Sequence, residues 1–208
     1  AYKMLGALDA FKVDALGAVE ADIGASTGGF TQVLLERGAS RVYAVDSGRD
    51  QLAPQLRADP RVCVMEGCNA RGLSRGDIGT VDIVVMDVSF ISQALLYPAV
   101  CDILREGGDF ISLIKPQFEV GREHIGGGGI VRDRRAREAA VVHLLETAAD
   151  FGLAARSLIR SRIEGGDGIL EYLALFTAAG SAQTLPDGWE RRIKEVSGED
   201  KKCCTDSE

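Results

Sequence analysis

The sequence predicts an α/β doubly wound domain, with a mostly parallel seven-stranded sheet and an antiparallel hairpin at one edge. Strand-like segments alternate with helix-like segments along most of the chain, which favours a parallel sheet covered by helices on both faces. Residues 81–86 are a continuous β-branched run, as in strands buried on both faces. A length of 208 residues, 46% of them hydrophobic, suits one domain with its own core.

The N-terminal part of the chain shows the alternation most regularly. Gly24 ends the first strand-like run, and turn residues separate the later ones. In chain order we expect a helix at residues 4–11, a strand at 19–23, a helix at 30–37, a strand at 41–45, a helix at 51–58 and a strand at 62–65.

The C-terminal part completes the sheet. Gly107 and Gly108 are expected to end a helix before the next strand, and the glycine-heavy stretch at 121–129 is a loop by composition. Asp133 caps a long helix whose apolar positions follow the 3.6-residue period: Val141, Leu144, Leu145, Ala148 and Phe151. The remaining expected elements are a strand at 81–86, a helix at 95–104, a strand at 110–114, and strands at 154–163 and 169–176 joined by a turn at 164–168.

The composition also divides the chain and limits its class. We expect residues 1–180 to form the domain and residues 181–208 to be a polar tail, partly disordered, that frays from Ser197. The net charge of −7 argues against a stand-alone nucleic-acid-binding module, which is usually basic. No run is long enough to span a membrane, and the N-terminus has no signal-peptide core. Five cysteines in no regular spacing predict no metal site and a reducing cytoplasm.

A glycine-rich turn follows the first strong strand and opens a helix. Small residues at this place let the backbone approach a ligand at the open end of a doubly wound sheet. Asp46, at the end of the second strand, can accept both ribose hydroxyls of a nucleoside. Ser26 stands where a dinucleotide fingerprint needs its second glycine, so S-adenosylmethionine is favoured over a dinucleotide, and a turn without a ligand stays open. The predicted cofactor-binding residues are Asp22, Gly24, Ser26, Thr27, Gly28, Gly29, Phe30, Asp46, Asn69 and Asp87.

The residues that follow the fourth and fifth predicted strands indicate whether an amine, a carbon or a hydroxyl is methylated. Asp87 is followed by Val-Ser-Phe, without the prolines common in enzymes that methylate amines, and no cysteine follows a proline as in carbon methylation. Lys115 ends the fifth strand and suits a hydroxyl target, which must lose its proton as it attacks. Spacing alone would select neither Lys3 nor Glu171, since a surface lysine and a strand glutamate are usually solvated.

Several unusual strings give the chain a family resemblance. It resembles the TlyA-type "hemolysin" ribosomal RNA methyltransferases, whose catalytic domain is FtsJ-like and Rossmann-like. The matching strings are Ala7–Phe11 (ALDAF), Asp22–Thr31 (DIGASTGGFT), Val42–Asp46 (VYAVD), Asn69–Arg71 (NAR), Asp87–Ser92 (DVSFIS), Ile114–Glu119 (IKPQFE) and Gly129–Asp133 (GIVRD).

The resemblance implies S-adenosylmethionine-dependent 2′-O-methylation of a ribose in ribosomal RNA. It also implies a catalytic tetrad of Lys3, Asp87, Lys115 and Glu171. Lys115 would activate the hydroxyl, Asp87 and Glu171 would orient it, and Lys3 would adjust the charge.

The resemblance further implies a small N-terminal RNA-binding domain that is absent from this sequence. A separate basic domain would explain how an acidic chain handles ribosomal RNA or a ribosomal subunit. Two alternatives remain: a membrane-damaging hemolysin, and a domain that binds the cofactor but has lost catalysis.

Overall fold

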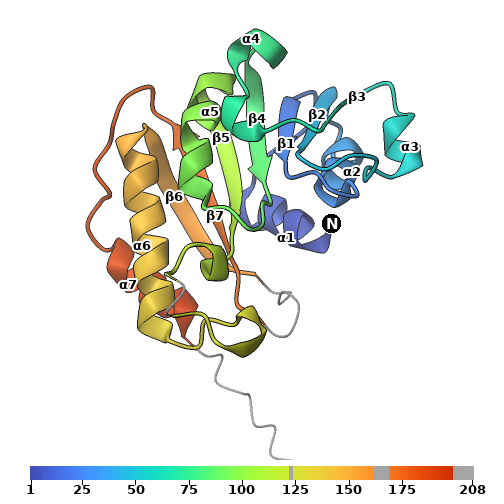
Figure 1. Ribbon diagram of the computed structural model, residues 1–208. Coiled ribbons are helices and arrows are strands. Elements are labelled where there is room, and N and C mark those ends of the chain that lie inside the picture. The colour runs from blue at the N-terminus through green and yellow to red at the C-terminus, as the bar shows by residue number, and fades with distance from the viewer. Residues whose placement is uncertain (122–123, 162–168, 199–208) are drawn as a thin grey trace, which may run out of the picture.

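The computed structural model describes residues 1–121, 124–161 and 169–198 and has a three-layer architecture (Figure 1). In the described residues, seven strands form one sheet in the order β3-β2-β1-β4-β5-β7-β6. The first five strands pair in parallel, and β7 runs antiparallel to both β5 and β6. The strands are β1 (Val19–Ile23), β2 (Arg41–Asp46), β3 (Val62–Glu66), β4 (Val81–Met86), β5 (Leu104–Ile114), β6 (Leu153–Arg160) and β7 (Tyr172–Ala178). The predicted fold class is therefore confirmed.

Two hydrophobic cores lie on opposite faces of the sheet, because successive strand side chains point to opposite faces. Ile23, Val84 and Phe110 belong to one core, while Ala44 and Val85 belong to the other. The first core is covered by α4 (Arg75–Ile78), α5 (Tyr97–Ile103), α6 (Arg134–Asp150) and α7 (Trp189–Ser197). The second is covered by α1 (Tyr2–Phe11), α2 (Gly29–Glu36) and α3 (Pro54–Arg57).

The sequence predicted that Gly107 and Gly108 separate a helix from the next strand, and this prediction is wrong. β5 begins at Leu104, directly after α5, and contains both glycines. Gly107 has φ 73°, and the pairing register with β4 shifts between Val81 and Ile83. The glycines therefore form a bulge within β5, where a positive φ is needed without ending the strand.

The long helix α6 matches its prediction at its start and along its buried face. The Asp133 carboxylate accepts a hydrogen bond from the Arg135 amide and caps the helix. Val141 and Leu144 are fully buried. Phe151 was expected on this face, but it lies at the C-terminal cap and is 45% exposed. The 3.6-residue period fails there because the helix has already ended.

The sequence predicted neither α4 nor α7. Residues 181–198 were expected to be polar tail, yet α7 packs against α6 and β6, and its Ile193 is buried in the core. Trp189 and Val196 lie at helical spacing from Ile193 and pack against the same core, so a short periodic signal stood in this otherwise polar stretch. The predicted turn at 164–168 and the tail from residue 199 lie outside the described residues.

Metal-ligating clusters and membrane-spanning helices can be sought only in the residues that the structure describes. The described residues contain no group of three or more His, Cys, Asp or Glu side chains that could hold a metal ion. No helix among them is long and apolar enough to cross a membrane.

Candidate active site

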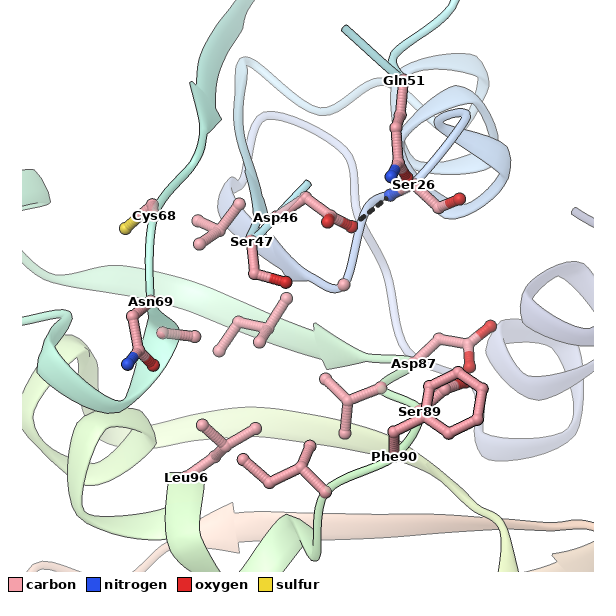
Figure 2. Close-up of a pocket in the computed structure, with 16 residues that line it drawn as sticks. Ser26, Asp46, Ser47, Gln51, Cys68, Asn69, Asp87, Ser89, Phe90 and Leu96 are labelled. Carbon is pink, nitrogen blue, oxygen red and sulfur yellow. Dashed lines mark hydrogen bonds between the residues drawn. The ribbon is translucent and has the colours of Figure 1, made fainter. Parts of the chain in front are cut away.

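A cavity of about 460 Å³ opens at the carboxyl ends of β1, β2 and β4 (Figure 2). The chain order of the strands reverses between β1 and β4, and doubly wound sheets bind ligands outside such a switch point. Among the predicted cofactor residues, five line this cavity: Gly24, Ser26, Asp46, Asn69 and Asp87. The structure thus brings together residues from four separate segments.

Gly24 is required where β1 ends against the strand beside it. Its φ is 87°, and a Cβ at this position would lie 2.2 Å from the Asp87 carbonyl oxygen. The Asp87 amide also donates to the Ile23 carbonyl at 2.9 Å, so the two strand ends are held together. Any side chain at residue 24 would push Asp87 away from the cavity wall.

The Asp46 carboxylate is fixed by two backbone amides. Oδ2 accepts a hydrogen bond from the Ser26 amide at 2.8 Å, and Oδ1 accepts one from the Gly48 amide at 2.7 Å (Figure 2 draws the first). Ser26 adopts a left-handed backbone with φ 48° to make this contact. The two amides therefore fix the orientation of the Asp46 carboxylate at the cavity.

Asn69 approaches the same cavity from the segment after β3. Its Oδ1 accepts a hydrogen bond from the Arg71 amide at 3.1 Å and caps a short 3-10 turn. Ser47, Gln51, Cys68, Ser89 and Phe90 also line the cavity, although the sequence had not singled them out as cofactor residues. The available signal was their place, one to five residues beyond strand ends.

Asp22 lies beneath the turn and not on the cavity wall. It is fully buried, and its Oδ2 accepts hydrogen bonds from the Thr31 amide at 2.9 Å and the Thr31 hydroxyl at 2.7 Å. Burial raises the pKa of Asp22 to about 7, with smaller contributions from Asp87 and Asp46. Its visible role is to hold the start of α2 against β1.

The other predicted residues of the turn shape the backbone and do not line the cavity. Thr27 accepts the Ala53 amide through its carbonyl at 3.2 Å. Gly28 caps α2 with φ 95°, and a Cβ there would lie 2.2 Å from Leu56 Cδ1. Gly29 begins α2, and Phe30 is buried in the second core.

The four predicted catalytic side chains form two ion pairs. Lys115 Nζ lies 2.6 Å from Asp87 Oδ1, outside hydrogen-bonding directions, and donates a hydrogen bond to Ser89 Oγ at 2.9 Å. Lys3, on α1, forms an ion pair with Glu171, whose side chain is 5% exposed. Ile114 pairs with Tyr172, so Lys115 and Glu171 lie next to each other where β5 and β7 meet.

The loops that follow β4 and β5 are tied to each other. Glu119 accepts hydrogen bonds from the Ser92 hydroxyl at 2.7 Å and the Gln93 amide at 3.0 Å. The rings of Phe90 and Phe118 also lie 5.0 Å apart. Phe90 is 91% exposed and has φ 65°, so these contacts hold an aromatic ring in solvent beside Asp87.

Comparison with known proteins decides the family. A family model described as FtsJ-like methyltransferase matches residues 1–177. The chain belongs to the FtsJ-like methyltransferase family. It is 44% identical over 200 residues to the 16S/23S rRNA (cytidine-2′-O)-methyltransferase TlyA of Mycobacterium tuberculosis, which covers 94% of this chain and 75% of the relative.

Solved structures of other family members have the same fold. A protein from Streptococcus thermophilus described as a hemolysin has a TM-score of 0.87 at 41% identity, covering 93% of this chain and 71% of that one. One from Lactococcus lactis, also described as a hemolysin, has a TM-score of 0.87 at 40% identity, covering 94% and 95%. More distant S-adenosylmethionine-dependent methyltransferases share the Rossmann-like fold, as for one from Listeria monocytogenes (TM-score 0.64, 18% identity).

S-adenosylmethionine is the cofactor of this FtsJ-like chain, and the cavity fits it. Its volume lies within the range of about 300–1,000 Å³ usual for small-molecule sites. Asp46 presents a carboxylate fixed by backbone amides, and Gly24 lets the Asp87 backbone close against the end of β1 at the cavity wall. Val88, Ile91 and Leu96 add apolar walls, so a nucleoside can be held by both polar and apolar contacts.

Proposed function

We propose that this chain transfers a methyl group from S-adenosylmethionine to the 2′-hydroxyl of a ribose in ribosomal RNA. The observation that carries the proposal is the Lys115–Asp87 ion pair at the edge of the cofactor cavity, with the Lys3–Glu171 pair beside it. The 44% identity to a protein named as an rRNA 2′-O-methyltransferase supports the same reaction.

Lys115 is assigned the activation of the hydroxyl. When bound, S-adenosylmethionine supplies a methyl group on a positively charged sulfur, which leaves as a neutral thioether. As the hydroxyl oxygen forms its bond to that methyl carbon, Lys115 in its neutral amine form takes the proton that the oxygen loses, and the ammonium that results pairs with Asp87. Asp87 and Ser89 hold Nζ in place, because both contact it directly.

The other pair sets the orientation and charge around that step. Glu171 is almost fully buried, and an unpaired carboxylate there would be costly. Lys3 removes that cost by pairing with it. Asp87 contacts Lys115 Nζ directly, while Glu171, next to Lys115 in the sheet register, has its carboxylate balanced by Lys3.

Cofactor binding is assigned to the residues of the large cavity. Asp46 would hold the ribose hydroxyls and Asn69 would lie near the adenine, while Gly24 and Ser26 shape the approach. Asp87 would contribute to both sites, since it lines the cavity and pairs with Lys115. Asp22, Thr27, Gly28, Gly29 and Phe30 would support the turn from below.

An exposed aromatic ring beside the catalytic pair supports a nucleic-acid substrate. Phe90 offers a π-face in solvent, and bases of unpaired RNA commonly stack on such rings. Arg132, Arg134 and Arg135 are also exposed and can contact phosphates. A ribosomal RNA target favours a cytoplasmic location. The expectation that a further basic domain supplies most of the RNA affinity stays a prediction.

The test is the identity of the methylated atom. Ribosomal subunits from cells that lack this enzyme are incubated with the protein and S-adenosylmethionine carrying a labelled methyl group. The RNA is digested to nucleosides and separated by mass spectrometry. We expect the label on ribose. A label on a base would contradict the proposal, and cofactor binding without any transfer would favour the domain that has lost catalysis.

The hemolysin alternative has a separate test. Liposomes loaded with dye are exposed to the cofactor-free protein. The proposed function predicts no dye release at concentrations that saturate methyl transfer, and release at low dose would favour membrane damage.

A further inference from the structure

A smaller cavity, which shares no lining residue with the cofactor cavity, lies next to the predicted catalytic residues in the chain. Its volume is about 230 Å³. Pro116 and Leu170 are in its wall, and each is the chain neighbour of a predicted catalytic residue, Lys115 and Glu171. A group bound there would therefore lie beside the reacting ribose.

Residues of two motif strings that have no role in the methyl-transfer step line this cavity. Gln117 belongs to the string that follows β5, and Ile130, Val131 and Arg132 belong to the string that precedes α6. Arg137, from the first turns of α6, completes the wall and anchors the second string: its guanidinium donates to the carbonyls of Val131 at 2.6 Å and Arg132 at 3.0 Å.

Two polar atoms of the lining residues have no hydrogen-bond partner among the residues that the structure describes. Gln117 Oε1 is a buried acceptor without a donor, and Arg137 Nε is a buried donor without an acceptor. Leaving such groups unpaired is costly, so a ligand that supplies both partners gains from each of them. The Gln117 amide can turn about its last torsion, which has no narrow staggered preference, to direct Oε1 at a ligand.

We propose that this cavity binds a base of the RNA substrate next to the ribose that is methylated. The Watson–Crick edge of each base carries a donor beside an acceptor, which complements Gln117 Oε1 and Arg137 Nε. The apolar walls, among them Pro116, Ile130 and Val131, suit the flat faces of a base. A phosphate carries acceptors only and would leave Gln117 Oε1 unpaired. This inference rests on the proposed function.

The first experiment removes the unpaired acceptor. Gln117→Met keeps the size of the side chain and costs the fold no hydrogen bond, since Oε1 makes none. We expect the unfolding temperature and the cofactor affinity to be unchanged. KM for ribosomal subunits should rise about tenfold, with little change in kcat. The matched control is Gln32→Met, in an exposed glutamine of α2, which should leave KM unchanged. An unchanged KM in Gln117→Met would overturn the proposal.

The second experiment identifies the base. RNA substrates carry an abasic residue at the methylated nucleotide or at either neighbour. At one of these positions the abasic residue should lower kcat/KM of the wild type about tenfold. The same abasic residue should not lower kcat/KM of Gln117→Met any further. That position is the bound base. Independent losses at all three positions would contradict a contact between Gln117 and a base.

A third measurement does not depend on turnover, so it separates failure of this inference from failure of the proposed function. The Arg137 Nε–H resonance is followed by NMR with S-adenosylhomocysteine present. We expect it to shift on addition of nucleoside 5′-monophosphates and not of ribose 5-phosphate. Equal shifts with both would indicate an anion site, and no shift with either would indicate no base site. Absence of ribose methylation with the expected shifts would overturn the proposed function alone.

Discussion

Lys115 and Asp87 form an ion pair across adjacent parallel strands, with Nζ 2.6 Å from Oδ1. The two residues come directly after β5 and β4, so their backbones are held by the sheet itself. The Lys115 side chain is 14% exposed and that of Asp87 is 30% exposed. A lysine held this firmly at the edge of a cofactor cavity can meet a hydroxyl in one orientation, which is the main requirement for in-line transfer.

Gly24→Ala should abolish cofactor binding. The new Cβ would lie 2.2 Å from the Asp87 carbonyl oxygen, at a φ of 87° that alanine rarely adopts. We expect loss of S-adenosylmethionine binding by calorimetry and a lower unfolding temperature. Gly6→Ala is the matched control, because a Cβ there meets nothing within 4 Å and the residue lies in α1. It should bind normally and be slightly more stable. Normal binding by Gly24→Ala would remove this cavity as the cofactor site.

Phe90→Ala should weaken RNA binding while the cofactor still binds. A base stacked on the exposed ring would contribute roughly 1–3 kcal/mol, or about 5- to 150-fold in KM. Phe90→Tyr keeps the aromatic face and should restore most of the affinity. Methylation kinetics with ribosomal subunits measure both variants. If Phe90→Ala had an unchanged KM, the ring would not contact the substrate.

Glu119→Gln should loosen the two loops that carry the catalytic pair. The carboxylate accepts hydrogen bonds from the Ser92 hydroxyl and the Gln93 amide, and burial raises its pKa. An amide nitrogen facing either donor would break one of these bonds, at a cost of about 1.5–3 kcal/mol in unfolding free energy. Denaturant unfolding would measure that loss, and Glu146→Gln, on an exposed side chain of α6, should lose nothing. Equal stability of the two variants would contradict the role given to Glu119.

Glu20 makes the fold sensitive to alkaline pH. It is fully buried in β1, and neither carboxylate oxygen has a hydrogen-bond partner in the described part of the chain. Burial raises its pKa from 4.5 to about 8, with Asp22 and Asp82 adding to the effect. The folded state therefore holds the proton more tightly than the unfolded chain. The resulting stability is complete below about pH 4.5 and is lost as the pH rises through about 8.

Glu20→Gln should remove most of that dependence. We expect the variant to match the wild type near pH 4.5 and to exceed its unfolding free energy by about 2–4 kcal/mol at pH 9. Asp22 titrates with the same sign, with a pKa raised to about 7, so a smaller slope should remain. Exposed Glu190, replaced by Gln, is the control. Parallel pH profiles for Glu20→Gln and the wild type would contradict this assignment.

The sheet could be predicted from the sequence because buried strands leave a strong local signal. The β-branched run at Val81–Met86 and the closing pair of extended runs both appear as strands in the structure. The bulge at Gly107 could not be predicted, since glycine also ends helices and only the pairing with β4 distinguishes the two cases. Helix α7 was missed because its period, Trp189, Ile193 and Val196, is short and lies in a stretch whose overall composition is polar.

Some residues of the candidate site could also be predicted from the sequence, and others could not. Asp46 is the last residue of β2 and Asp87 directly follows β4, so their place at the open end of the sheet was predictable from chain position. Glu171 and Lys3 are 168 residues apart; the antiparallel pairing of β7 with β5 brings Glu171 beside Lys115, and Lys3 joins them from α1 through its ion pair with Glu171. Family resemblance identified them where spacing could not. The burial of Asp22 was also not predictable, because its Thr31 partner lies on the following helix.

The central claim is that Lys115 carries methyl transfer to ribose, and Lys115→Met tests it most directly. Methionine keeps the length of the side chain and removes the nitrogen, while Lys194→Met on α7 is the exposed control. Single-turnover transfer to ribosomal subunits should fall by about 10²- to 10⁴-fold in Lys115→Met, with cofactor affinity and unfolding temperature unchanged, and should stay normal in the control. Ribose methylation at the wild-type rate in folded, cofactor-bound Lys115→Met would contradict the account.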